Sequence, residues 1–188
     1  MSLRLALSTL LLAAAPTAVM AQAMPDGFLC CNMRTDGKWI SDINYVAPGK
    51  YVLPAGTPIK VTGYGRHRVM TQIEGQPQIL GNDYSRDLQL DTFAQRYVVA
   101  ANPQTKISTF PPRVREAIKS SRLFVGMTRE QVLMSVGYPV TSENPRLEAN
   151  IWRYWLNMNE EFQVVFDAQG LVKEIGALPL ARSQIVME

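Results

Sequence analysis

The chain has little of the residue types on which enzymes and metal sites most often depend. It carries one histidine and two cysteines in 188 residues. A single histidine, His67, excludes a histidine-rich metal site and leaves at most one general base of that type. The two cysteines, Cys30 and Cys31, are adjacent, so no disulfide can join distant parts of the chain. The sequence leaves open whether they form a vicinal disulfide or stay as two thiols.

Charge is also scarce, because Asp, Glu, Lys and Arg make up only 19% of the residues. The 19 basic side chains are scattered against 16 acidic ones, with no basic run and no basic stripe interleaved with aromatic residues. This distribution gives no indication of nucleic-acid binding. With 47% hydrophobic residues, the chain is long enough for one large domain or two small ones, and disorder is not expected over most of it.

The one long apolar run lies at the N-terminus. Arg4 precedes an apolar stretch that closes on Ala21-Gln22-Ala23, the pattern of a secretory signal peptide over residues 1–23. Pro16 interrupts the run well short of the roughly 20 residues that a membrane span needs. Export to the periplasm is therefore expected. A lipid anchor at Cys30 stays as an alternative, although no small residue directly precedes that cysteine.

Residues 24–101 have the pattern of a small β-rich domain. Short runs of β-branched and aromatic residues alternate with Gly and Pro, as in Pro54-Ala55-Gly56-Thr57-Pro58 and Glu74-Gly75-Gln76-Pro77. Gly63 and Gly65 predict a break before a strand from Arg66 to Ile73. Residues 91–99 fit a helix as well as a strand. The spacing of strands and turns predicts a small barrel-like module.

The proline-rich residues 102–111 predict a linker, and residues 112–180 predict a second domain of α+β class. Its first helix would begin at Pro112. The second is the best local signal in the chain: Thr128 and Gln131 form a capping box, and Gly137 supplies the stop before Pro139. An apolar stripe on this helix is assigned to the core; it consists of Val132, Leu133 and Val136.

Three strands should follow the two helices, at residues 151–156, 162–166 and 171–175. The four-residue turn from Asp167 to Gly170 makes the last two antiparallel. The predicted fold of this half is thus a two-helix, three-stranded antiparallel (ααβββ) layer. Residues 181–188 are expected to be a tail without a role.

The order of motifs in the second half resembles the SmpA/OmlA family, also called BamE, over about residues 112–177. The matching motifs are G-M-T-x-x-Q-V, a Gly-x-Pro stop, an aromatic strand and V-x-F-x-x-x-G-x-V, and they correspond to Gly126, Met127, Thr128, Gln131, Val132, Gly137, Pro139, Trp152, Tyr154, Val164, Phe166, Gly170 and Val172. The resemblance implies a non-catalytic interaction module of the cell envelope. The P-A-G-T-P turn of the first half resembles bacterial SH3-like barrels.

Three features of the sequence are candidates for functional sites. His67 could assist Cys30 or Cys31 in a cysteine-type hydrolase, but no catalytic motif surrounds them. No calcium-loop spacing or other metal-binding pattern is present, and no cofactor is expected. The polar segment 82–87 is either a surface turn in which Arg86 pairs with Asp87, or a recognition loop in which Tyr84 and Arg86 contact a partner.

The aromatic strand offers the other candidate. Alternation places Trp152 and Tyr154 on one face and Trp155 on the other, so whichever face is not core exposes aromatic side chains to a partner. Alternatively, both faces are covered. The candidate partner-binding residues are thus Trp152, Tyr154, Trp155, Tyr84 and Arg86.

The predicted function is a non-catalytic envelope protein that binds other envelope proteins at the outer membrane or cell wall, with peptidoglycan or the outer-membrane surface as further candidate partners. The alternative is an inhibitor or ligand-binding protein of a periplasmic enzyme. A cysteine-type hydrolase is the third interpretation. The sequence does not specify the partner or the oligomeric state.

Overall fold

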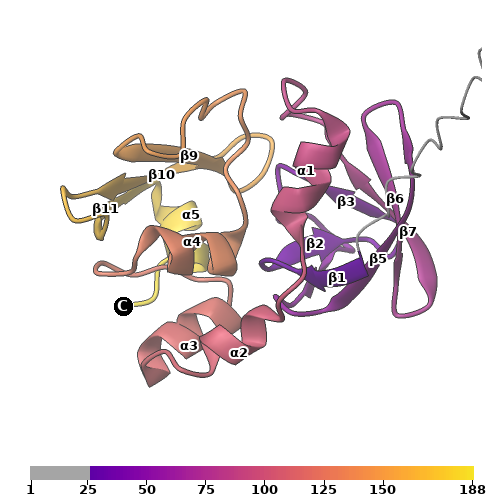
Figure 1. Ribbon diagram of the computed structural model, residues 1–188. Helices are drawn as coiled ribbons and strands as arrows, with labels where there is room; N and C mark the ends of the chain where they lie inside the picture. The colour runs from indigo at the N-terminus through magenta and orange to yellow at the C-terminus, as the bar shows by residue number, and fades with distance from the viewer. Residues whose placement is uncertain (1–25) are drawn as a thin grey trace, which may run out of the picture.

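The computed structural model of the chain describes residues 26–188, and the predicted signal peptide lies outside these residues. The N-terminal half consists mainly of strands, and most of the helices follow it in the chain (Figure 1). In chain order the elements are β1 (Asp26–Leu29), β2 (Met33–Thr35), β3 (Trp39–Ser41), β4 (Tyr51–Leu53), β5 (Pro58–Gly65), β6 (Arg68–Ile73), β7 (Gln76–Gly81), α1 (Leu90–Tyr97), β8 (Val98–Val99), α2 (Pro103–Ile107), α3 (Pro112–Lys119), α4 (Arg129–Val136), β9 (Ile151–Trp155), β10 (Glu161–Phe166), β11 (Val172–Ala177) and α5 (Pro179–Ile185).

The N-terminal half is one curled sheet of eight strands in the order β4-β2-β3-β7-β6-β5-β1-β8, a half-barrel. All the pairs are antiparallel except β3 with β7. The β6–β7 hairpin turns at Glu74 and Gly75, and both have positive φ, which suits a tight hairpin connection. Helix α1 packs into the curl through Phe93, Ala94 and Tyr97, all buried with the strand residues. The ambiguous segment 91–99 is therefore a helix followed by the short strand β8.

Two local predictions for this half were wrong. Strand β5 does not break at Gly63 and Gly65; it runs to Gly65 with a register shift between Val61 and Gly63, where a bulge accommodates the glycine. His67 is not a strand residue. It has φ of 56° and lies in the turn between β5 and β6.

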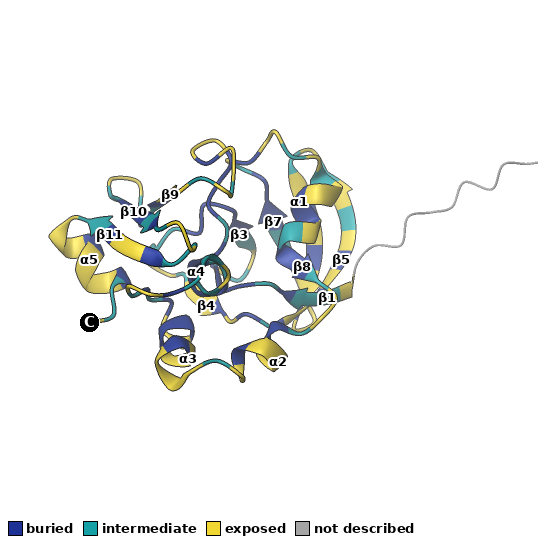
Figure 2. Ribbon diagram, turned by 60° about the vertical axis from the view of Figure 1, so that its left-hand side comes forward, coloured by how far each residue is buried: buried dark blue, intermediate teal, exposed yellow. Residues whose placement is uncertain are grey.

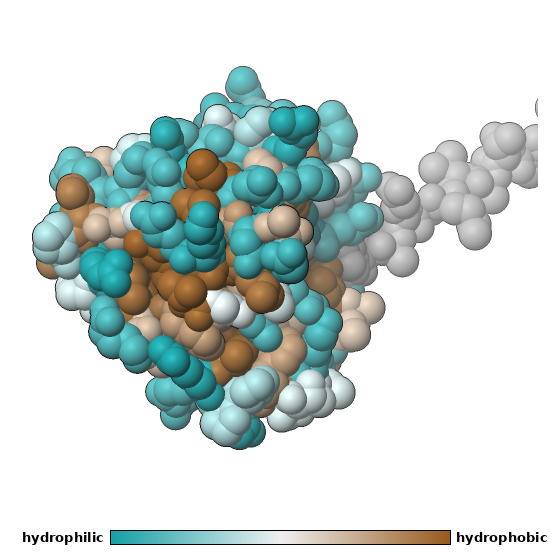
Figure 3. All heavy atoms as spheres, turned by 90° about the vertical axis from the view of Figure 1, so that its left-hand side faces the viewer, coloured by the Kyte–Doolittle hydropathy of each residue, from teal (hydrophilic) through white to brown (hydrophobic). Residues whose placement is uncertain are grey.

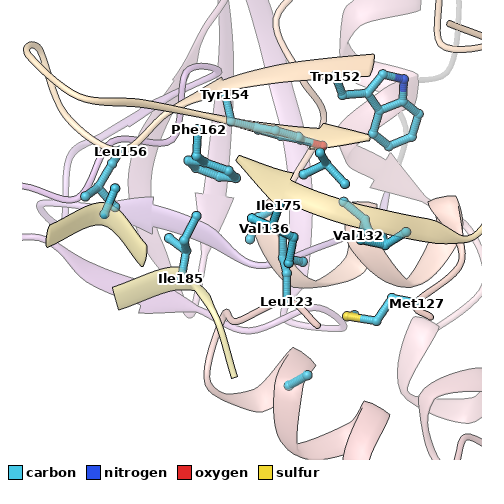
Figure 4. Packing of buried hydrophobic residues seen from close by; sticks show 14 of the residues in the cluster. Leu123, Met127, Val132, Val136, Trp152, Tyr154, Leu156, Phe162, Ile175 and Ile185 are labelled. Atoms are coloured by element: carbon cyan, nitrogen blue, oxygen red, sulfur yellow. The ribbon is translucent and has the colours of Figure 1, made fainter. Parts of the chain in front are cut away.

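The C-terminal half places helices on one face of a sheet with strand order β11-β10-β9. Its core joins side chains from the sheet to α4, α5 and the segment before α4; Figure 4 shows Tyr154 and Phe162 on the side of the sheet that faces Leu123, Val136 and Ile185. The rings of Tyr154 and Phe162 stack with their centroids 5.1 Å apart. This half is the predicted α+β layer, with one more helix than predicted.

The additional helix is α5, which begins at Pro179 and ends at Ile185. Ala181 and Ile185 are buried in the core, and the backbone of Leu123 bonds to that of Ile185 and Met187. The C-terminal residues 181–188 are thus part of the packed module, and the expectation of a tail without a role was wrong. The segment 102–111, predicted as a linker, contains α2.

Helix α4 has the predicted ends. The Thr128 hydroxyl accepts a hydrogen bond from the N–H of Gln131, and the Gln131 side chain accepts one from the N–H of Thr128, which completes the capping box. Gly137 ends the helix with φ of 87°. Val132 and Val136 are in the core as predicted, but Leu133 is only half-buried.

The halves are joined by hydrogen bonds as well as by packing. Asn32 in the N-terminal half donates to the carbonyl of Ile118 (2.6 Å), near the end of α3, and to the hydroxyl of Ser121 (3.0 Å), just after that helix. Asn44 donates to the carbonyl of Val136 at 2.9 Å. The helices α2, α3 and α5 keep their outer faces exposed (Figure 2).

Candidate interaction surface

The backbone of the segment 82–87, between β7 and α1, is held in place by hydrogen bonds to Asp42. The Asp42 carboxylate is buried and accepts hydrogen bonds from the backbone N–H groups of Asp83 (3.2 Å) and Tyr84 (3.1 Å). The backbone N–H of Asp42 in turn donates to the carbonyl of Gly81. Two consecutive N–H groups of the loop therefore converge on one carboxylate, which fixes the loop's backbone.

The side chain of Asp83 completes this support. Its carboxylate accepts hydrogen bonds from the Ser41 hydroxyl (2.7 Å) and the indole Nε1 of Trp39 (3.3 Å). The guanidinium of Arg68 lies over the Trp39 ring, 4.5 Å from its centroid. Asp83 thus connects the loop to β3.

The same loop is bonded to the C-terminal half. The carbonyl of Tyr84 accepts a hydrogen bond from the N–H of Ser142 (3.2 Å), and the Ser85 hydroxyl accepts one from the N–H of Thr141 (3.2 Å). The Asp87 carboxylate accepts a hydrogen bond from the Thr141 hydroxyl. Asp87 is therefore engaged by Thr141, whereas the turn interpretation paired it with Arg86.

Tyr84 and Arg86 project from this fixed backbone and are exposed. They stand between two hollows of about 510 and 520 Å³, each of which both side chains help to line. The rest of the first hollow consists of side chains from β3 and the segment after it together with Asp83, namely Trp39, Ser41, Ile43, Tyr45 and Lys50. The rest of the second consists of Asp83, Asp87, Thr141, Ser142 and Pro145.

Burial changes the acid strength of the residue beneath the loop. Removal from water raises the pKa of the Asp42 carboxyl to about 6, because a buried charge is disfavoured. The neighbouring charge of Asp83 raises this pKa further, while the hydrogen bonds from the N–H of Tyr84 and from the Ser85 side chain lower it. The anchor of the loop therefore changes charge in the mildly acidic range.

The side chains of the aromatic strand β9 alternate between the two faces of the sheet as predicted, but two of the candidate binding residues lie on the buried face. Trp152 and Tyr154 are buried in the core, with relative exposures of 1% and 7%. The Trp152 ring packs edge-on against Phe166, and the Tyr154 hydroxyl donates to the carbonyl of Gly137 at 3.2 Å. Trp152 and Tyr154 cannot present an exposed surface to a partner, so the prediction that they bind one was wrong. The helices cover their face of the sheet.

Trp155 lies on the opposite face of β9 and is half-buried. It is paired in register with Glu161, next to Arg153, which forms ion pairs with Glu143 and Glu161 (3.4 Å each). This face is thus mixed in character rather than an apolar patch. Figure 3 shows hydrophobic residues gathered in the middle of the side on which the C-terminal half lies, with hydrophilic residues around them.

The cysteines of the cysteine-type hydrolase interpretation do not provide a nucleophile. Cys30 and Cys31 are bonded to each other in a vicinal disulfide, so neither has a thiol to serve as a nucleophile. With the disulfide formed, a cysteine-type hydrolase would have no nucleophile. Among residues 26–188, no three side chains of His, Cys, Asp or Glu lie together as a metal ion would require.

The sequence predicts Tyr84 and Arg86 as candidate binding residues but gives no signal for the residues that support their loop. Asp42 and Trp39 lie about forty residues earlier in the chain, and nothing in their local pattern connects them to segment 82–87. The parallel pairing of β3 with β7 brings them together, since it aligns Ser41 with Gly81.

None of the helices within residues 26–188 is long and apolar enough to cross a membrane.

The two packed modules carry a loop with a fixed backbone and exposed side chains. Comparison with protein families gives a match for the second module. Residues 114–176 match the family described as the outer membrane protein assembly factor BamE domain, which confirms the predicted resemblance to the SmpA/OmlA family in the C-terminal half. The match does not extend to the N-terminal half, whose likeness to SH3-like barrels stays a prediction. No curated protein and no solved structure matches the chain.

Proposed function

We propose that the protein is a non-catalytic interaction module of the cell envelope, which binds another envelope protein at the outer membrane or cell wall through the surface around Tyr84 and Arg86. The observation that carries the proposal is that both side chains stay exposed on a loop whose backbone is hydrogen-bonded to both halves of the molecule. The BamE domain match supports a role related to outer-membrane protein assembly.

The chemistry of the surface suits a protein partner. Tyr and Arg are the residue types that most often dominate the binding energy of interfaces, since each offers a large contact area with directed hydrogen bonds. A loop already fixed in the free protein loses little conformational entropy when a partner binds. Trp39 and Tyr45 in one adjoining hollow and Pro145 in the other provide apolar area beside the two exposed side chains.

The proposal is tested by photo-crosslinking in the cell that makes the protein. A photoreactive phenylalanine analogue replaces Tyr84 in one variant and Tyr64 in the matched control, because the two tyrosines have similar exposures of 43% and 38% but Tyr64 lies on β5 and lines neither hollow. We expect residue 84 to crosslink to a discrete protein of the outer-membrane fraction and residue 64 not to.

The double variant Tyr84→Ala with Arg86→Ala should abolish co-fractionation of the protein with that partner, whereas Tyr64→Ala should leave it unchanged. Equal crosslinking at both positions, or co-fractionation that survives the double substitution, would refute the proposed surface. A discrete soluble periplasmic enzyme crosslinked at residue 84 would instead favour the inhibitor alternative.

A further inference from the structure

A third hollow, of about 570 Å³, lies where the two halves meet, and no part of the proposed function uses it. We name it the junction hollow. Its walls come from four places in the chain: the disulfide after β1, the segment after β8, helix α2 and helix α4. The side chains that matter for its chemistry are those of Cys30, Cys31, Leu133, Met134, Lys106 and Glu130.

The interior of the junction hollow is apolar and rich in sulfur. Leu133 and Met134 from α4 line it together with the cysteine pair, and Val99 and Pro103 contribute further aliphatic surface. Thioether and cysteine sulfurs are polarisable and make favourable contacts with aromatic rings. A hollow of several hundred Å³ that is lined mainly by apolar groups, with few polar groups at its edge, has the properties of a small-molecule site.

The charges beside the hollow neutralise each other. The Lys106 ammonium and the Glu130 carboxylate form an ion pair at 2.6 Å, and both side chains are about half exposed. A ligand with net charge would have to break this pair and would meet one group of its own sign. The site therefore complements an uncharged ligand.

Two features of the molecule that border the hollow are accounted for by such a site. Leu133 belongs to the apolar stripe of α4, yet it is only half-buried because it faces the hollow. The Cys30–Cys31 disulfide closes no intervening chain, and the stabilisation expected from a disulfide grows with the length of the loop that it closes. Leu133 and the disulfide both contribute surface to the junction hollow.

We infer that the junction hollow binds an uncharged, largely aromatic or hydrocarbon small molecule, with the Cys30–Cys31 disulfide and Met134 as its sulfur-lined wall. The test uses the uncharged naphthyl probe N-phenyl-1-naphthylamine, whose fluorescence rises in apolar surroundings. Titration of the oxidised chain, without its signal peptide, should give saturable binding with one site per molecule.

The decisive variant is Leu133→Glu, which puts a carboxylate into the hollow and should weaken probe binding at least tenfold. Val125→Glu is the matched control, since Val125 is 63% exposed and does not line the hollow; its affinity for the probe should equal that of the wild type. Circular dichroism confirms that both variants are folded. Equal weakening in both, or none in either, would overturn the assignment.

A measurement on the wild type keeps the test decisive if Leu133→Glu does not fold. Amide chemical shifts recorded with and without the probe should change at residues 30–31, 99–109 and 130–138 and stay constant on the sheet β9–β11. Shift changes centred on β9–β11, or the absence of saturable binding, would refute the site.

Discussion

The carboxylate of Asp42 accepts a hydrogen bond from the backbone N–H of Tyr84 at 3.1 Å, so a buried acid directly supports the most exposed aromatic side chain of the candidate surface. This contact spans 42 residues of sequence and exists because β3 runs parallel to β7. Its strength depends on the charge of Asp42, which gives the loop a measurable pH dependence.

The first prediction concerns stability between pH 4 and pH 7. Burial raises the pKa of Asp42 from 3.8 in the unfolded chain to about 6 in the folded protein, so in this range the folded state holds a proton that the unfolded state has lost. The stabilisation from this proton is fully present below pH 3.8 and is lost as the pH rises through about 6. It amounts to roughly 3 kcal/mol for a shift of about two pKa units.

Chemical denaturation of the wild type and of Asp42→Asn across this range measures the effect. The difference in free energy of unfolding between the two should change with pH, in favour of the variant as the pH rises, because the Oδ1 of Asn can still accept from the N–H groups of Asp83 and Tyr84 and carries no charge. Asp36→Asn is the control: Asp36 is exposed, and backbone hydrogen bonds from Lys38 and Trp39 lower its pKa, so its effect falls below pH 4. Parallel pH profiles for wild type and Asp42→Asn would contradict the prediction.

The second prediction concerns Asn32, which connects the halves. Its side chain donates to the carbonyl of Ile118 and to Ser121, and accepts from the N–H of Ala55 at 2.9 Å. Asn32→Ala leaves these buried groups without partners, at a cost of about 1–3 kcal/mol for each that finds no water. We expect a loss of about 3 kcal/mol in urea unfolding.

Asn159→Ala provides the control for Asn32→Ala, because Asn159 is exposed in the β9–β10 turn and its side chain supports no contact between the halves. It should change the free energy of unfolding by less than about 0.5 kcal/mol. If Asn32→Ala behaved like Asn159→Ala, the hydrogen bonds between the halves would not contribute to stability.

The third prediction compares two tryptophans three residues apart on β9. Trp152 is buried and its indole Nε1 donates to the carbonyl of Leu147 at 3.1 Å, whereas Trp155 is half-buried on the other face. Trp152→Ala should cost about 3–5 kcal/mol through the lost contacts and the cavity that remains. Trp155→Ala should cost clearly less, and equal losses in thermal unfolding would show that both faces of the sheet are closed.

The elements that could be predicted from sequence are those whose signals are local. The capping box of Thr128 and Gln131 fixes α4 within four residues, and the turn at Glu74 and Gly75 fixes a hairpin. The resemblance in the second half also rests on closely spaced motifs. Each of these depends on hydrogen bonds between near neighbours, which composition and spacing reveal.

The features that could not be predicted depend on distant partners. Leu133 satisfies the same helical stripe as Val132, but only the arrangement of α2 and the disulfide decides that it faces a hollow. Trp152 and Trp155 are equally aromatic, and the position of the helices decides which is core. Asp42 reaches the candidate loop only through a parallel strand pair, for which the sequence has no local signal.

The last prediction concerns the N-cap of α4, the helix that contributes to the core, the contact with α3 and the junction hollow. Thr128→Ala removes the hydroxyl that accepts from the N–H of Gln131 and should lower the free energy of unfolding by about 1 kcal/mol. Thr128→Ser keeps the hydroxyl and should stay within a few tenths of the wild type. Urea unfolding followed by circular dichroism distinguishes the two. If serine were as destabilising as alanine, the methyl group and its packing would support this helix start rather than the capping box.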